Sequence, residues 1–155
     1  MSFRFRRFLT PTIVGLAFAA GCWTGAARPQ LGAATAALQP VFTSYATVAA
    51  GKWQKVAPGL AIAGISHSAS ADFAVVQLSS IASHTHHFST EYGYVVSGTG
   101  KGMIGGKSAT VKPGDIFVIP PDVAHSFVAS GPPFRVVMVS MPPISNGDMH
   151  MTKTK

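Results

Sequence analysis

The sequence predicts a single all-β domain, and three observations favour this fold class. Charged residues make up only 11% of the 155 residues, so no long charged helix is expected. Glycine occurs 16 times and proline 11 times, which supplies residues for many turns. From Lys52 onwards, short apolar runs alternate with turn residues, the pattern of strands. A chain of this length fits one domain, with 47% hydrophobic residues to form its core.

Eight runs are expected to form strands: Leu60–Ile65, Phe73–Ser80, Glu91–Val96, Lys101–Ile104, Ser108–Val111, Asp115–Ile119, Ala124–Val128 and Arg135–Met141. Gly105-Gly106 is a hairpin signal, because a type I′ turn needs positive φ at both of its central positions. Pro113-Gly114 and Pro120-Pro121-Asp122 separate other runs. Eight short strands with such breaks indicate a closed β-barrel or jelly roll.

The first 27 residues have the layout of an export signal. Arg4, Arg6 and Arg7 form a basic region, the apolar stretch Leu9–Ala20 follows, and small residues continue to Ala27. The apolar stretch is shorter than the roughly 20 residues that span a membrane, although a helix extended to Ala27 would just cross. We therefore expect an exported protein, periplasmic or secreted, with an uncleaved membrane anchor as the alternative.

The single cysteine, Cys22, adds a further alternative. One cysteine cannot form an internal disulfide, so no such bond is expected to stabilise the fold. The run Ala19-Ala20-Gly21-Cys22 is similar to the lipobox of bacterial lipoproteins, in which the cysteine is acylated and tethers the protein to a membrane. Ala19 stands where leucine is usual in that motif. Cleavage after Ala27 without acylation is the other reading of the same segment.

The rest of the chain divides by composition into three parts. Residues 28–51 are expected to form an Ala/Pro-rich tether, with a short element over residues 41–50 that packs on the domain. Residues 52–143 carry the strand pattern, and residues 144–155 are expected to form a flexible tail. Four of the 12 basic residues lie within the first 28 positions, which leaves 8 basic residues against 5 acidic ones. No basic stripe interleaved with aromatic residues remains, so we exclude nucleic acid as a partner.

Residue types that bind metals gather in the segment 84–91, which reads His-Thr-His-His-Phe-Ser-Thr-Glu, and His125 lies on a later strand. Histidines at i and i+2 of an extended strand share a face, so His84 and His86 are expected to converge while His87 points away. Three imidazoles and Glu91 make a mixed nitrogen and oxygen set that suits a borderline divalent transition metal. Glu91 is the only glutamate, and an unpaired carboxylate on an apolar strand would be costly, which favours a ligand role.

These residues resemble the two motifs of the cupin superfamily. His84-x-His86-x4-Glu91-x6-Gly98 resembles the first motif, and Gly114-x5-Pro120-x-Asp122-x2-His125 resembles the second. The departures are Leu78 and Asp122 at glycine positions and Ala129 at an asparagine position. None of the four ligand positions is lost, and with the strand pattern the likeness covers roughly residues 60–141.

The resemblance implies a small, single-domain, cupin-type jelly-roll β-barrel. It also implies one divalent transition metal, held inside one mouth by His84, His86, Glu91 and His125. The metal is left open among Mn, Fe, Ni, Cu and Zn. A homodimer is expected as well, since small cupins are often dimers.

Alternation along the strand that carries Glu91 predicts which residues face the metal. If Glu91 points inward, Gly93 and Val95 do too, while Tyr92 and Tyr94 point outward. Gly93 would then leave room beside the metal. The two tyrosines would lie on a surface that a second subunit covers.

Four polar residues outside the ligand set are expected to have ordinary surface or turn roles. His67 and His150 lie outside both motifs and are interpreted as surface histidines. Asp115 follows a turn glycine and is expected to stabilise that turn. Arg135 is placed at the rim of the barrel rather than against a substrate anion.

Three functions stay open at this point. Four protein ligands leave two positions on an octahedral ion for water, dioxygen or a chelating substrate, and Glu91 is the candidate catalytic carboxylate. The first hypothesis is therefore a metal-dependent dioxygenase acting on a small enolic or phenolic molecule. The second is a non-catalytic module that binds a metal or a small molecule. The third is a structural barrel without metal, against which the intact ligand set argues.

Overall fold

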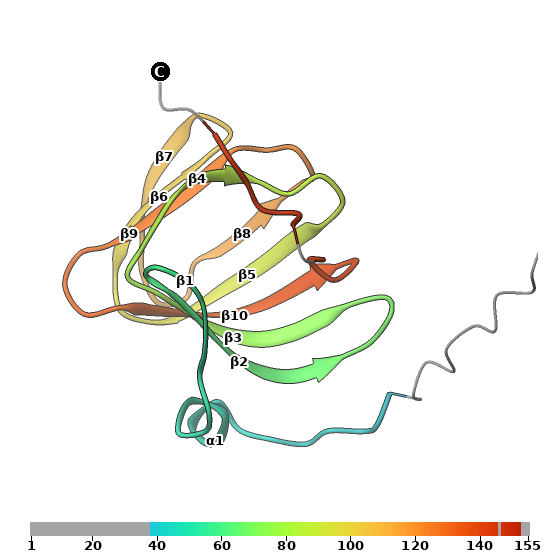
Figure 1. Cartoon of the computed structure of the whole chain (residues 1–155). Helices are drawn as coiled ribbons and strands as arrows, with labels where there is room; N and C mark the ends of the chain where they lie inside the picture. Colours follow the sequence, from blue (N-terminus) through green and yellow to red (C-terminus); the bar gives the residue numbers. More distant parts are fainter. Residues whose placement is uncertain (1–37, 146, 153–155) are drawn as a thin grey trace, which may run out of the picture. The chain divides into compact units, whose positions relative to one another are not determined.

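The computed structural model describes residues 38–145 and 147–152. The predicted export signal, Cys22 and residues 28–37 of the tether lie outside these residues. Two antiparallel β-sheets pack against each other, as predicted for an all-β jelly roll (Figure 1). In the part of the chain that the structure describes, no helix is both long and apolar enough to cross a membrane.

The larger sheet, sheet A, has six strands in the order β1-β2-β3-β10-β5-β8. Their bounds are Gln54–Ala57 for β1, Leu60–His67 for β2, Asp72–Leu78 for β3, Phe134–Met141 for β10, Thr90–Ser97 for β5 and Ile116–Ile119 for β8. Sheet B has five strands in the order β11-β4-β9-β6-β7. Their bounds are His150–Met151 for β11, Ser80–Thr85 for β4, His125–Ala129 for β9, Gly100–Ile104 for β6 and Lys107–Val111 for β7.

A short helix, α1 (Tyr45–Ala49), precedes the strands. Ser44 caps it, because its hydroxyl accepts a hydrogen bond from the N–H of Thr47 at 3.1 Å. The Nε1–H of Trp53 donates to the carbonyl of Ala49 at 3.0 Å and ties the end of the helix to the segment that enters β1. This helix is the short element that the sequence places after Val41.

Alternation along the strands separates the core from the surface. On β10, Phe134, Val136, Met138 and Ser140 are buried, while the residues between them are less so. On β5, Glu91, Gly93 and Val95 are buried, whereas Tyr92 and Tyr94 are 46% and 48% exposed. The predicted inward and outward faces of β5 are therefore confirmed. The homodimer expected over the two tyrosines stays a prediction.

All eight predicted strands are present, with ends that shift by up to two residues. Three strands come in addition: β1, β4 and β11. The last of these corrects the expectation of a flexible tail over residues 144–155. In the described part of this segment, β11 pairs antiparallel with β4, with His150 opposite Thr85 and Met151 opposite His84. The backbone hydrogen bond from Thr152 N–H to the carbonyl of Ser83, at 2.9 Å, continues this pairing.

The sequence predicts open room next to Gly93, beside the metal, but the structure shows this space filled. The ring of Phe117 fills it, and a Cβ added to Gly93 would lie 2.2 Å from Phe117 Cζ. Phe117 in turn packs on Phe127 with ring centroids 5.1 Å apart, which leaves the ring little freedom to move away. Gly93 thus admits an aromatic side chain to the core and leaves no open room there for a ligand.

Replacing Gly93 with alanine is expected to destabilise the barrel by about 1–3 kcal/mol, because the new methyl group overpacks against Phe117. The measurement is the free energy of unfolding in urea. Gly64→Ala is the matched control, since a Cβ at Gly64 meets nothing within 4 Å, and its change should stay within about 0.5 kcal/mol. Equal stability of Gly93→Ala and the parent would contradict this packing.

Candidate metal centre

Three imidazoles converge between the sheets. His84 is the penultimate residue of β4 and lies directly opposite His125, the first residue of β9. His86 follows two residues after His84 and, as predicted from the i, i+2 spacing, reaches the same centre. All three side chains are buried, and each offers a ligand atom within 4.8 Å of the other two. In the described part of the chain this is the one group of three or more such residues close enough to hold an ion.

Each imidazole is oriented by a main-chain carbonyl. Nδ1 of His84 bonds to the carbonyl of Ala82 at 2.8 Å, and Nδ1 of His125 bonds to that of Val123 at 2.9 Å. Nδ1 of His86 bonds to the carbonyl of Asp148 at 2.6 Å. A carbonyl oxygen can only accept, so Nδ1 carries the proton in all three rings and Nε2 is the free ligand nitrogen.

Glu91 completes the predicted set from the opposite sheet. It lies on β5, its side chain is buried, and its Oε2 is 3.2 Å from Nε2 of His125. The structure thus brings His84, His86 and His125 together as one donor group and places Glu91 against His125. Their donor set of three imidazole nitrogens and one carboxylate oxygen suits a divalent transition metal.

Burial keeps His84 in the form that binds metals. Desolvation of the buried ring lowers the pKa of His84 below its usual value, and the neighbouring His125 and His86 lower it further. The carbonyl of Ala82 and the carboxylate of Glu91 oppose this shift. The net lowering favours neutral imidazole, the form in which nitrogen can donate its lone pair to an ion.

Asp148 is the residue of the site that sequence reasoning missed. It is only 3% exposed, its carbonyl orients His86, and its Oδ1 accepts a hydrogen bond from the N–H of His87 at 2.8 Å. Burial alone would raise the pKa of Asp148, but the N–H groups of His87 and Phe88 hold it below its usual value. Its other oxygen, Oδ2, is buried without a hydrogen-bond partner among the described residues. We call residues 147–152, which carry Asp148 and β11, the C-terminal strap.

The remaining predicted residues lie away from the convergence point. His87 points outward, where its Nδ1 contacts Oδ1 of Asp122. Its ring packs on that of His150, with the two ring centroids 4.0 Å apart. His67 is exposed and paired with Asp72. Arg135 donates from Nε to Gln77 at 3.1 Å and lies over the ring of Trp53. Asp115 accepts from the N–H and the ammonium of Lys112, as expected of a residue that stabilises a turn.

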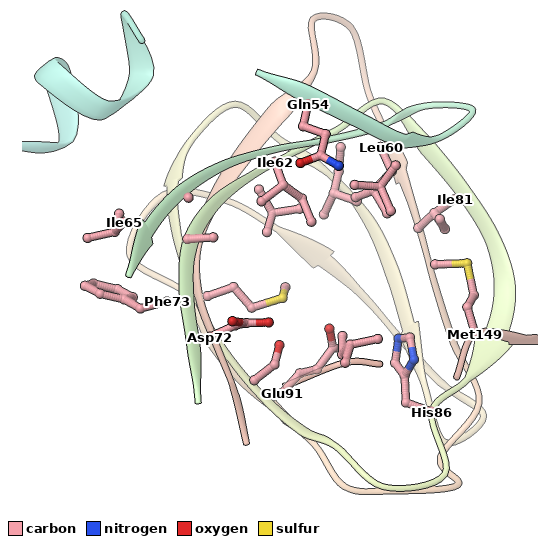
Figure 2. A pocket seen from close by; sticks show the side chains of 18 of the residues that line it. Gln54, Leu60, Ile62, Ile65, Asp72, Phe73, Ile81, His86, Glu91 and Met149 are labelled. Atoms are coloured by element: carbon pink, nitrogen blue, oxygen red, sulfur yellow. The ribbon is translucent and has the colours of Figure 1, made fainter. Parts of the chain in front are cut away.

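A cavity of about 500 Å³ opens beside the imidazoles. His84, His86, Glu91 and His125 line one part of it, and β1, β2 and β3 supply much of the remainder (Figure 2). Ile144 and Met149, which follow β10, contribute to its wall. The arrangement places an ion-binding donor set where a small molecule can reach it, the usual layout of a ligand site.

Comparisons with known proteins agree with this geometry. A family model described as "Cupin domain" matches residues 75–140. The structure of KdgF from Halomonas sp. is similar over 68% of this chain and 96% of its own, with 26% identity and a TM-score of 0.59. A search of curated proteins found no match.

Two more distant structures show the fold alone. An RmlC-like cupin from Shewanella frigidimarina is 18% identical over 72% of this chain and 96% of its own, with a TM-score of 0.56. Pac13 of Streptomyces, a nucleoside dehydratase, is 17% identical over 73% of this chain and 92% of its own, with a TM-score of 0.55. Both motifs of the sequence fall within the matched region, and the two sheets reproduce the expected barrel, so residues 75–140 match a cupin domain.

Proposed function

We propose that the protein is an exported, metal-dependent oxygenase of small organic molecules. One divalent transition metal would be held by His84, His86, Glu91 and His125. The observation that carries this proposal is the convergence of three buried imidazoles, all with Nδ1 fixed on main-chain carbonyls, at one side of the cavity. Export is supported by the sequence pattern of the first 27 residues.

The bound ion, Glu91 and the cavity wall would have separate roles in the reaction. A bound ion would supply Lewis-acid activation or oxygen chemistry at the positions that the protein ligands leave open. Glu91 lies beside the imidazoles, and we assign to its carboxylate the transfer of a proton from a substrate hydroxyl. The apolar wall of the cavity excludes water from the reacting groups.

The same apolar wall favours a second candidate, a module that binds a small molecule without converting it. Pockets that are mostly apolar, with a few convergent polar groups, occur in binding proteins as well as in enzymes. The two candidates differ in whether a stabilising ligand is consumed. A ligand that raises the Tm and is recovered unchanged in the presence of metal and oxygen supports the binding module.

Oxygen uptake tests the proposal directly. The full chain is loaded separately with Mn, Fe, Ni, Cu or Zn and presented with a panel of enols and catechols. We expect uptake that requires a redox-active metal and falls at least about 100-fold in Glu91→Gln, because the proton acceptor is lost. Lys101→Ala, which changes an exposed residue of β6 that does not line the cavity, should keep the parent rate. No uptake with any metal across the panel would refute the oxygenase.

A further inference from the structure

The lining of the cavity has an unusual charge composition for a site that holds small molecules. Among the described residues that line it there is no lysine and no arginine. Its ionisable side chains are two carboxylates, Asp72 and Glu91, and four imidazoles. Away from the metal centre, a negatively charged group on a ligand would therefore find no lysine or arginine to balance it, and its desolvation would go uncompensated.

Most of the wall is apolar. Leu60 and Ile62 on β2, Ile81 on β4, Phe127 on β9, Met138 on β10 and Met149 on the C-terminal strap all line it. None of these side chains donates or accepts a conventional hydrogen bond. Hydroxyl or amide groups distributed around a ligand would lose their bonds to water against this wall and gain none in return.

Polar side chains interrupt this wall in two ways: Gln54, Ser66 and His67 line it singly, and a polar row crosses three neighbouring strands. Ser140 on β10 lies opposite Asp72 on β3 and also opposite Glu91 on β5, and all three residues line the cavity. Figure 2 shows Asp72 and Glu91 on the same side of the cavity as His86, with Leu60 and Ile62 across from them. Asp72 is also held by His67 on the adjacent strand β2. The carboxylate oxygens accept hydrogen bonds and the Ser140 hydroxyl can accept one as well, so this row suits hydrogen-bond donors.

We propose that the ligand is a neutral molecule with an apolar ring body and hydroxyl groups along one edge. The hydroxyls donate to the row Asp72–Ser140–Glu91 beside the metal ligands, and the rings lie against Leu60, Ile62 and Ile81. A volume of about 500 Å³ accommodates a molecule of this size. Carboxylated sugars and phosphorylated compounds are disfavoured by charge, and nucleosides by the polar groups that surround their rings. This inference rests on the proposed function, because it assigns the substrate class of the same site.

Calorimetry on the full chain loaded with zinc, which does not undergo redox chemistry, tests the inference. The probes are naphthalene-2,3-diol, 3,4-dihydroxybenzoate, which has the same diol head and an added carboxylate, and uridine, which is neutral and polar. We expect naphthalene-2,3-diol to bind at least about tenfold more tightly than either of the others. Equal or tighter binding of dihydroxybenzoate or uridine would overturn the inference.

Two variants test whether the charge of the cavity wall, and not the metal centre, decides which probe binds more tightly. Ile62→Lys places a cation in the cavity and should bring dihydroxybenzoate at least level with naphthalene-2,3-diol. Val128→Lys, the same charge on an exposed residue of β9 outside the cavity, should keep the parent ranking. If Ile62→Lys still binds naphthalene-2,3-diol more tightly than dihydroxybenzoate, as the parent does, the assignment of a neutral ligand would be contradicted. A chain that binds no zinc refutes the metal centre, yet the ranking on that metal-free chain still tests the cavity, so the two failures are distinguishable.

Discussion

Replacing His125 with alanine is expected to remove the bound metal. The parent chain, reconstituted with a divalent transition metal and freed of excess ion, should hold one ion per chain. His125→Ala should lower the metal affinity by at least about 100-fold, because one of three imidazole ligands is lost and substitutions around ligands already cost 10–100-fold. His84→Ala should behave in the same way, since His84 faces His125 across β4 and β9. Elemental analysis and competition with a chelating dye measure both effects.

The control for this experiment lies one residue from a predicted ligand. His87 neighbours His86 in the sequence, but its ring points outward to Asp122 and His150. His87→Ala should therefore keep one ion per chain, and His67→Ala should do so as well. Equal metal content in all variants would show that the imidazole cluster does not hold the ion. A parent that stays empty after reconstitution with each metal would refute the metal centre itself.

Removing the C-terminal strap is expected to weaken metal binding without removing any ligand. A chain that ends at Asn146 loses the carbonyl that orients His86 and the oxygen that accepts from the N–H of His87. We expect the metal affinity to fall about 10–100-fold, as for other groups that orient a ligand histidine. Isothermal titration with zinc gives the affinities of the truncated and full chains.

Two single substitutions sharpen this test. Asp148→Ala keeps the carbonyl but leaves the N–H of His87 without its acceptor, which should cost about 1–3 kcal/mol of folding free energy. Met151→Ala changes an exposed side chain of β11 and keeps the backbone pairing with β4, so its affinity should equal that of the full chain. An unchanged affinity in the truncated chain would show that His86 is oriented without the strap.

The convergence of His84 and His86 could be predicted from the sequence because the two residues lie close together along the chain. His84, His86 and Glu91 lie within eight residues of one another, and period-two alternation is enough to assign His84 and His86 to one face. Strand β4, which carries His84, was harder to predict. Its sequence Ser-Ile-Ala-Ser-His-Thr buries an imidazole where an apolar residue would have shown the alternation. Its pairing with β9 and β11 establishes it as a strand.

Asp148 had no local pattern that could reveal its role. It follows a proline-rich segment and a turn glycine, residues that are typical of an irregular tail. Its partners, His86 and His87, lie 62 and 61 residues away along the chain. Only the folded arrangement brings them together, so tertiary contacts decide the structure of the strap where intrinsic preference does not.

The four proposed ligands include residues of both sheets, so a bound metal ion would stabilise the folded barrel. Glu91 belongs to sheet A through β5, whereas His84 and His125 belong to sheet B through β4 and β9. An ion held by all of them is a cross-link between the two sheets, and the sheets cannot separate until it is released. Free ion at 100 times its Kd would add about 2.7 kcal/mol to the free energy of unfolding. The supply of metal would then govern how long the folded barrel survives, in addition to what it binds or converts.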